Sequence, residues 1–120
     1  MKQNKKTVIA VDFDRTLSLG PFPDCGPANE PLIAILKWLI KKPLEERDKC
    51  LVLWTSRKDR PLTDALAWLA GLGLVFDGVN SVPPGIKEFP DDTRKIWADI
   101  YIDDKSMTPE QFIQLYEWAK

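Results

Sequence analysis

The stretch that decides the fold is Val8-Ile9-Ala10-Val11-Asp12-Phe13-Asp14-Arg15-Thr16. Its first four residues are apolar and mostly β-branched, which predicts a buried strand. Asp12 and Asp14 follow where this strand ends. In an open α/β sheet, ligands bind beyond the carboxyl ends of the strands, so the two carboxylates are expected at the mouth of a site. An Asp-x-Asp pair also occurs as a simple turn after a strand, so its interpretation depends on later stretches of the chain.

Composition and charge limit the classes of protein that the chain can belong to. With 120 residues, 44% of them hydrophobic and 29% charged, residues 1–120 are expected to form one globular domain. The net charge of −1 predicts no nucleic-acid partner. No apolar stretch approaches the length of a membrane span and no secretory signal is visible, so we expect a cytoplasmic protein without a membrane partner. The absence of histidine excludes Ser-His, Cys-His and His-metal chemistry.

Apolar runs alternate with helical patterns along the whole chain. Strands are predicted at residues 8–11, 50–54, 74–76 and 98–102. Helices are predicted from the Asn29 cap to Pro43, from Pro61 to Gly71, over residues 92–97, and after the Thr108-Pro109 capping box. This alternation predicts βαβ units and a parallel sheet with the first strand central, which is a Rossmann-like three-layer α/β/α sandwich.

Two segments rich in proline and glycine interrupt the regular pattern. Residues 17–28 follow the first acidic pair directly, and residues 81–94 precede the last strand. A long loop beside a site is either a flap or wall of that site or a simple surface connection. The sequence leaves both interpretations open for residues 17–28, and the side chains of neither segment identify a substrate.

Three of the predicted strands end in polar groups that would meet at one edge of the sheet. These groups are Asp12 and Asp14 after the first strand, Thr55 and Ser56 after the second, and Asp103 and Asp104 after the last. Four carboxylates at one edge would repel one another unless a cation sat among them, and an all-oxygen set without His or Cys suits Mg²⁺. Arg57 and Lys95 are nearby cations that could hold an anion. Together these groups fit phosphoryl transfer, in which a carboxylate attacks phosphorus and Mg²⁺ offsets the charge.

These motifs, in this order, resemble those of the haloacid dehalogenase-like (HAD) hydrolase superfamily over nearly the whole chain. Asp12-Phe-Asp14-Arg-Thr16 resembles the first motif, which implies that Asp12 is the nucleophile and Asp14 the general acid/base. Thr55 resembles the phosphoryl-binding Thr or Ser of the second motif. Lys95 resembles the lysine of the third. Tyr101-Ile-Asp103-Asp104 resembles the acidic fourth motif, which with Asp12 and Asp14 implies a Mg²⁺ site.

The chain departs from the family pattern at two positions. Arg15 stands where the family often has Gly, at a position that varies. Lys87 competes with Lys95 for the third motif, and Lys95 is preferred because it directly precedes the strand that bears Asp103. Neither loop is long enough for a cap domain, so the chain looks most like the small capless members with Ile-Asp-Asp at the fourth motif. Some of those members are linked to sugar or polysaccharide biosynthesis.

The resemblance implies a Mg²⁺-dependent phosphatase that hydrolyses a phosphate monoester through an aspartyl-phosphate on Asp12. The expected substrate is a phosphorylated small molecule, such as a sugar phosphate or a nucleotide, although phosphorylated macromolecules stay open. Thr55, Ser56 and Lys95 would bind the phosphoryl group, and Arg57 and Thr16 are further candidates for substrate contacts. The oligomeric state is open, because capless relatives often cover the site by forming homo-oligomers.

Two other functions compete with the phosphatase. The first is a non-catalytic HAD-like module that binds metal or phosphate and regulates a partner. The intact Asp12/Asp14 pair argues against such a module. The second is a phosphorelay receiver domain, in which the phosphorylated Asp follows the third strand. Here the predicted third strand is followed by Asp77.

Overall fold

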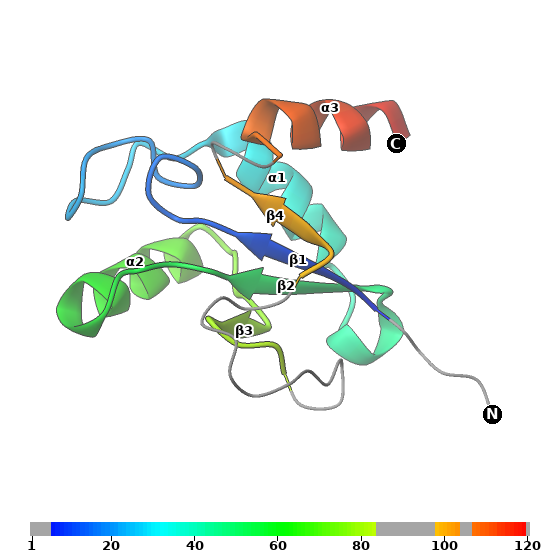
Figure 1. Ribbon diagram of the computed structural model, residues 1–120, viewed down its shortest axis with the longest axis horizontal. Coiled ribbons are helices and arrows are strands. Elements are labelled where there is room, and N and C mark those ends of the chain that lie inside the picture. Colours follow the sequence, from blue (N-terminus) through cyan, green and yellow to red (C-terminus); the bar gives the residue numbers. More distant parts are fainter. Residues whose placement is uncertain (1–5, 84–97, 104–106, 120) are drawn as a thin grey trace.

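The computed structural model describes residues 6–83, 98–103 and 107–119 and contains a four-stranded parallel sheet in the order β3-β2-β1-β4 (Figure 1). The elements in chain order are β1 (Thr7–Val11), α1 (Glu30–Leu39), a short 3₁₀ helix (Leu44–Glu46), β2 (Lys49–Leu53), α2 (Asp59–Gly71), β3 (Gly78–Val79), β4 (Ile100–Ile102) and α3 (Pro109–Ala119). The predicted α/β class, the parallel sheet and the central position of the first strand are confirmed.

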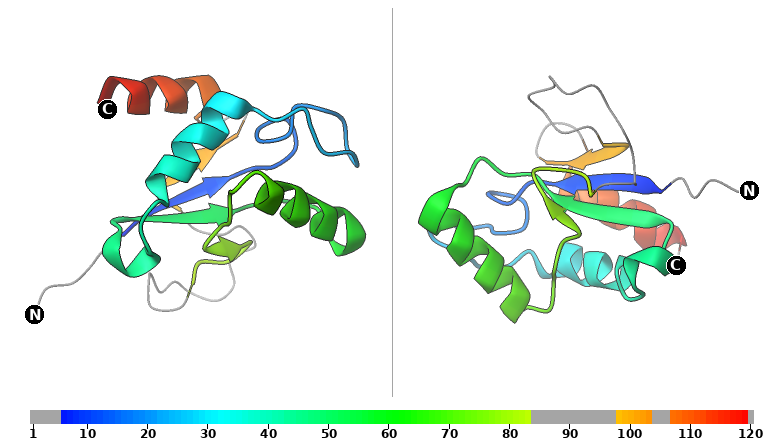
Figure 2. Two further views of the ribbon diagram at one scale, coloured as in Figure 1. Left: turned by 180° about the vertical axis from the view of Figure 1, so that it is seen from behind. Right: turned by 90° about the horizontal axis from the view of Figure 1, so that it is seen from below.

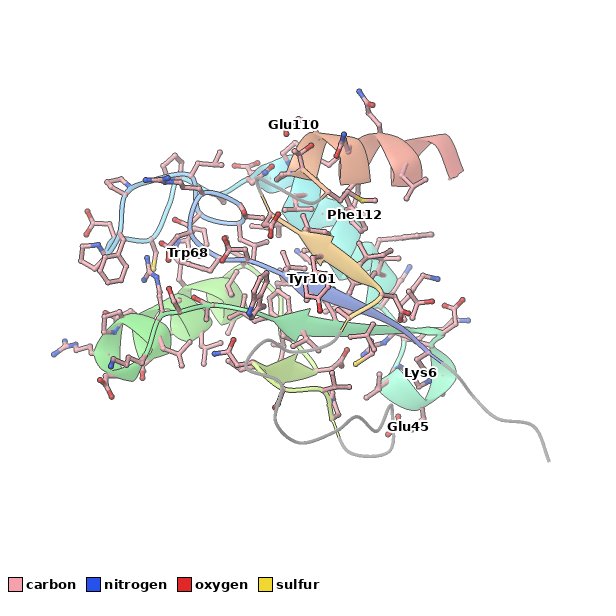
Figure 3. All side chains as sticks on the ribbon, viewed as in Figure 1. Lys6, Glu45, Trp68, Tyr101, Glu110 and Phe112 are labelled. Carbon is pink, nitrogen blue, oxygen red and sulfur yellow. The ribbon has the colours of Figure 1, made fainter. Side chains whose placement is uncertain are left out.

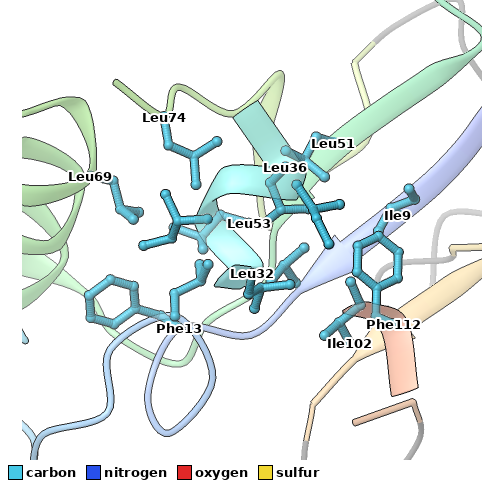
Figure 4. Packing of buried hydrophobic residues seen from close by; sticks show 14 of the residues in the cluster. Ile9, Phe13, Leu32, Leu36, Leu51, Leu53, Leu69, Leu74, Ile102 and Phe112 are labelled. Atoms are coloured by element: carbon cyan, nitrogen blue, oxygen red, sulfur yellow. The ribbon is translucent and has the colours of Figure 1, made fainter. Parts of the chain in front are cut away.

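One face of the sheet is packed against all three helices (Figure 2). Alternate residues of β1 and β2 point to this face, as the two-residue period of a strand requires. They pack against apolar side chains of α1 and α2 and against Phe112 of α3, in the cluster shown in Figure 4. The sheet side chains in this cluster are Ile9, Val11, Leu51, Leu53 and Ile102.

The other face of the sheet carries a second, smaller apolar cluster. Its buried members are Val8, Ala10, Cys50, Val52 and Ala98, and none of them comes from α1, α2 or α3. Burial in this cluster raises the pKa of the Cys50 thiol to about 11. The helix expected over residues 92–97, which would belong to a third layer, lies outside the described residues.

The helix ends follow local capping chemistry. The Asn29 side chain accepts a hydrogen bond from the Leu32 backbone N–H and begins α1, as predicted. Thr108 and Gln111 form the predicted reciprocal capping box, with Gln111 N–H donating to Thr108 Oγ1 at 3.2 Å and Thr108 N–H donating to Gln111 Oε1 at 3.0 Å.

Two helix boundaries differ from those predicted. α1 ends at Leu39 rather than next to Pro43, because the chain leaves helical geometry at Ile40. α2 begins at Asp59, two residues before Pro61. Pro61 still falls in the first turn, where its missing N–H has no intrahelical partner to lose.

The third strand was wrongly placed by the sequence analysis. The apolar residues 74–76 do not pair in the sheet, and β3 comprises Gly78 and Val79 instead. Leu74 is buried in the helix-covered core, whereas Val75 is 65% exposed, so this run connects α2 to the sheet. Asp77 consequently precedes β3 and lies beside Leu51, in the middle of β2, rather than at the carboxyl end of a strand.

Asp77 forms a nearly buried ion pair with Arg47. Arg47 donates to both carboxylate oxygens of Asp77 at 2.9 Å, and the backbone N–H of Leu51 donates to Asp77 Oδ2 at 2.8 Å. Both side chains are only 9% exposed. This pair therefore joins the chain before β2 to the chain before β3.

No helix in the described part of the chain is long and apolar enough to cross a membrane.

Replacing Asp77 by Ala should lower the free energy of unfolding by about 3 kcal/mol, because the buried guanidinium of Arg47 loses its partner. Urea denaturation of the purified variant measures this loss. The matched control is Asp48→Ala, which removes a carboxylate that is 82% exposed and pairs with Lys49, and should change stability by less than about 1 kcal/mol. Equal effects of the two substitutions would show that the Arg47–Asp77 pair does not stabilise the fold.

Candidate active site

The register of the sheet brings three strand ends to one edge. Val11, the last residue of β1, pairs with Leu53 of β2 and with Ile102 of β4. The Asp12 backbone N–H donates to the Ile102 carbonyl at 3.0 Å, and the Trp54 N–H donates to the Val11 carbonyl at 2.9 Å. The residues that follow these strands therefore leave the sheet side by side, as expected for parallel strands.

Asp12 is the residue at the centre of this edge. Its Oδ1 accepts a hydrogen bond from the Phe13 backbone N–H at 2.8 Å, which fixes the orientation of the carboxylate. Asp12 is partly exposed and lines a cleft of about 1020 Å³ together with Asp14. Asp103 follows β4 at the same edge, and its N–H donates to the Met107 carbonyl.

Asp14 is paired with Arg57. Nε of Arg57 donates to Asp14 Oδ2 at 3.0 Å and Nη2 donates to Oδ1 at 2.7 Å, in a two-pronged geometry. The Arg57 side chain is fully buried, whereas that of Asp14 is 27% exposed. These bonds raise the pKa of Arg57, so it stays protonated. A carboxylate offers about four lone-pair positions, so Asp14 keeps acceptor capacity toward the cleft.

The other donors of Arg57 hold the loop of residues 17–28 and the first turn of α2. Nη2 also donates to the Asp24 carbonyl at 2.8 Å, and Nη1 donates to the carbonyls of Pro23 and Pro61, both at 3.1 Å. The guanidinium lies over the rings of Phe13 and Phe22, with its carbon 4.6 and 5.0 Å from the ring centroids.

All five N–H groups of Arg57 are therefore used inside the protein. Arg57 is a predicted substrate contact, and in the structure it borders the cleft with a fully buried side chain that holds Asp14 and the loop. The reason is burial: a buried guanidinium must satisfy its donors, and this one does so with Asp14 and three backbone carbonyls. The sequence contains no signal that pairs residue 57 with residue 14.

The two expected phosphate-binding hydroxyls lie in different environments. Thr55 is only 8% exposed, and its Oγ1 accepts from the Arg57 backbone N–H at 3.1 Å. Ser56 is exposed and lines the cleft. Asn80 fixes this segment and was not among the predicted site residues. Its Oδ1 accepts from the Thr55 N–H at 2.8 Å, and its own backbone N–H donates to the Leu53 carbonyl. The only local signal for Asn80 is its residue type, since Asn tolerates the positive φ of 57° found there.

Thr16 does not reach the cleft, so the expected substrate contact is wrong. Its residue surface is fully buried, and its Oγ1 has no hydrogen-bond partner among the described residues. It lies in a tight turn in which the Phe13 carbonyl accepts from the backbone N–H groups of Thr16, Leu17 and Ser18. Arg15 has φ of 66° in this turn, a left-handed conformation that glycine adopts without strain.

The loop of residues 17–28 forms one wall of the cleft, which decides the question that the sequence left open. Leu19, Pro21 and Phe22 line this wall, and Ser56, Lys58 and Pro61 line the opposite one. Trp68 of α2 lies beneath the loop (Figure 3), with its ring packed edge-on against Phe13 at 5.7 Å between centroids.

Three of the four predicted metal ligands, Asp12, Asp14 and Asp103, lie among the described residues. Within residues 6–83, 98–103 and 107–119, no three Asp, Glu, His or Cys side chains gather closely enough to hold a metal ion. The side chain of Asp14 is bonded to Arg57. Asp12 and Asp103 carry carboxylate oxygens, the donor type that suits a hard cation. Asp104, Lys95 and Lys87 lie outside the described residues.

Comparisons with known proteins identify a relative in structure but no function. No protein-family model matches the chain, and no curated protein matches it. A solved structure from Bacteroides thetaiotaomicron, described as a conserved protein coded by a locus, is 28% identical. The match covers 97% of this chain and 93% of that chain, with a TM-score of 0.72. The fold is therefore shared with a protein of nearly the same length.

Replacing Arg57 by Lys should destabilise the protein by about 1–3 kcal/mol. An ammonium cannot make the two-pronged contact of a guanidinium with Asp14, and it donates to fewer acceptors. Urea denaturation measures the loss, and amide hydrogen exchange at Gly26, whose N–H donates to Ser18 Oγ, reports loosening of the loop. Arg60→Lys is the control, since Arg60 is an exposed arginine three positions along the chain, in the first turn of α2. If Arg57→Lys changes neither stability nor exchange, Arg57 does not anchor the loop.

Proposed function

We propose that this protein is a Mg²⁺-dependent phosphohydrolase that cleaves a phosphate monoester through an aspartyl-phosphate, in the manner of the HAD-like hydrolases that its motifs resemble. One observation carries the proposal: Asp12, which directly follows the central strand, lines a cleft together with Asp14. Thr55 and Asp103 follow the two strands that flank β1. This proposal includes a phosphorylated small molecule as substrate and a cytoplasmic location.

Asp12 is the nucleophile in this mechanism. One of its carboxylate oxygens attacks phosphorus, the bond from phosphorus to the ester oxygen breaks, and Asp14 gives a proton to the departing oxygen. Asp14 then takes a proton from the water that attacks the acyl phosphate, which releases inorganic phosphate and restores Asp12. The hydrogen bond from the Phe13 N–H to Asp12 Oδ1 supports this assignment, because it orients a carboxylate that lines the cleft.

The pairing with Arg57 gives Asp14 a fixed orientation. Each oxygen of Asp14 accepts one bond from Arg57, and the exposed part of the carboxylate lies in the cleft. Proton transfer therefore uses the remaining lone pairs, or it uses an orientation in which one of the bonds to Arg57 has opened. Arg57 is a positioning residue for Asp14 in this mechanism.

Ser56 and Thr55 are the proposed hydroxyl donors to the phosphoryl oxygens, and the family resemblance adds Lys95. The resemblance likewise implies that Asp12, Asp103 and Asp104 hold Mg²⁺ with the backbone carbonyl of Asp14. When bound, Mg²⁺ offsets the repulsion between an attacking carboxylate and an anionic phosphoryl group. The role of the carbonyl is compatible with an Asp14 side chain that is bonded to Arg57.

Two alternatives are distinguished by particular residues. An Asp14 that Arg57 keeps from transferring protons would favour the non-catalytic module. The receiver domain is disfavoured, because Asp77 precedes β3 and both of its oxygens accept hydrogen bonds. The next two experiments test Asp12 and Asp14 separately.

Asp12→Asn should abolish turnover and leave the fold intact, because an amide cannot form the acyl phosphate. Release of inorganic phosphate from p-nitrophenyl phosphate with Mg²⁺ should fall by at least about 10³-fold. Thermal unfolding of the variant serves as the control for folding. Activity closer to that of the wild type would remove Asp12 as the nucleophile, and a wild type without activity on any phosphate monoester would favour the non-catalytic module.

Asp14→Asn should slow phosphoenzyme formation much more for an alkyl phosphate than for p-nitrophenyl phosphate, because nitrophenolate leaves without a proton. General acid–base assistance contributes about 10²–10⁴-fold. With the nitrophenyl ester, the variant should still phosphorylate Asp12 and then hydrolyse it slowly, which gives a burst in rapid-quench kinetics. Equal losses of the first step for both substrates, without a burst, would mean that Asp14 acts only through structure or metal binding.

A further inference from the structure

We propose that the cleft selects phosphate monoesters whose leaving group carries a planar aromatic ring, and that this ring stacks on the exposed face of Phe22. This inference names the substrate class and rests on the proposed function of the same site. Its support comes from the loop of residues 17–28, from the ring of Phe22 and from the charges at the mouth of the cleft.

The loop that carries Phe22 is an ordered hairpin. Ser18 and Ala28 form an antiparallel bridge, the Leu19 N–H donates to the Pro27 carbonyl at 2.8 Å, and the Gly26 N–H donates to Ser18 Oγ at 2.8 Å. Its two arms are so close that a Cβ on Gly20 would lie 1.9 Å from the Gly26 carbonyl oxygen. A side chain on this hairpin is therefore held in place before any ligand arrives, which limits the entropy that binding must overcome.

The Phe22 ring is supported on one side and open on the other. Arg57 lies 5.0 Å from its centroid, yet Phe22 remains 59% exposed and lines the cleft. Arg57 is itself fixed by five hydrogen bonds, so the ring rests on a rigid base. An aromatic ring held in this way, with more than half of its surface exposed and at the cleft, is a platform for a second flat ring.

Exposed apolar surface is concentrated at this cleft. The described residues expose five large hydrophobic side chains, and two of them, Leu19 and Phe22, line the same wall. Their proximity to Asp12 and Asp14 is unusual for a site that would bind only polar groups. A ligand that covers this wall removes apolar area from water at about 25 cal/mol per Å².

The cleft also offers two exposed cations to an anionic group of the ligand. Arg15 and Lys58 are exposed and line the cleft, with Asp59 beside Lys58. A neutral aromatic compound would leave these cations unused. A sugar phosphate without an aromatic ring would use the cations and leave Leu19 and Phe22 in water. A phosphate monoester with an aromatic leaving group uses both, and it is either a nucleotide or a simple aryl phosphate.

The experiment measures binding and turnover separately. Calorimetry on protein carrying Asp12→Asn, in Mg²⁺, gives the Kd of adenosine 5′-monophosphate, phenyl phosphate and ribose 5-phosphate without hydrolysis. Phe22→Leu keeps an apolar side chain and removes the planar ring, and Phe22→Tyr keeps the ring. Trp38→Leu is the matched control, because Trp38 is an aromatic residue that is 49% exposed and lines a different cleft.

We expect Phe22→Leu to raise the Kd of the two aromatic phosphates by about 5-fold or more, since stacking of one base contributes about 1–3 kcal/mol. The Kd of ribose 5-phosphate should change by less than about 2-fold, as should all three constants in Phe22→Tyr and Trp38→Leu. A larger loss for adenosine monophosphate than for phenyl phosphate identifies a nucleotide site, and the reverse identifies an aryl phosphate site.

Equal changes for aromatic and aliphatic phosphates in Phe22→Leu, or no change for either, overturn the inference. Steady-state turnover of the same three compounds by protein with Asp12 intact then separates the two proposals. Ring-dependent binding without turnover would refute the phosphatase and retain the aromatic site. Turnover without ring-dependent binding would retain the phosphatase and refute the aromatic site. Absence of binding by all three compounds would refute both proposals.

Discussion

A buried guanidinium must satisfy all of its donors, and the cleft of this protein is built around that constraint. Arg57 has a fully buried side chain with five N–H groups, each of which needs an acceptor. It finds two at Asp14, two in the loop of residues 17–28 and one in the first turn of α2. Arg57 thereby holds the start of α2 against Asp14 and the loop of residues 17–28, which lie 33 to 43 positions away from it in the sequence.

The pairing with Arg57 affects both the stability of the fold and the orientation of Asp14. A buried ion pair offsets its desolvation cost only with good geometry, and the two-pronged contact of 2.7 and 3.0 Å supplies it. The same contact fixes the carboxylate that we propose as the general acid/base, two residues from the proposed nucleophile. Arg57 also supports the Phe22 ring from below, so the proposed acid and the proposed aromatic platform share one positioning residue.

Carboxylates beside the sheet serve in two different ways. Before β3, the Asp77 carboxylate is nearly buried, and Arg47 and the Leu51 N–H occupy both of its oxygens. At the carboxyl edge, Asp12 and Asp14 keep part of their surface in an open cleft. A carboxylate whose bonds are all internal stabilises the fold, whereas one that keeps access to a cleft is able to meet a ligand.

The sequence by itself determined the features that depend on neighbouring residues. The apolar run before Asp12, the cap at Asn29 and the capping box at Thr108 act within a few residues, so the strand, the helix starts and the parallel α/β class could be predicted. The meeting of Asp12, Thr55 and Asp103 at one edge also followed, because parallel strands that end in polar groups must end at the same edge. The mistaken third strand at residues 74–76 arose because a short apolar run has the same pattern in a strand and in a buried connection.

Only the tertiary structure decided which side chains lie in the cleft and which are buried beside it. Residues 14 and 57 are separated by 43 positions, and no local pattern reports that one pairs with the other. Thr16 is two residues from Asp14 and is nevertheless fully buried, because the turn around the Phe13 carbonyl faces it inward. Ser56 lines the cleft while its neighbour Thr55 is nearly buried. Burial and pairing are properties of the packed molecule, since they depend on what distant segments place against each side chain.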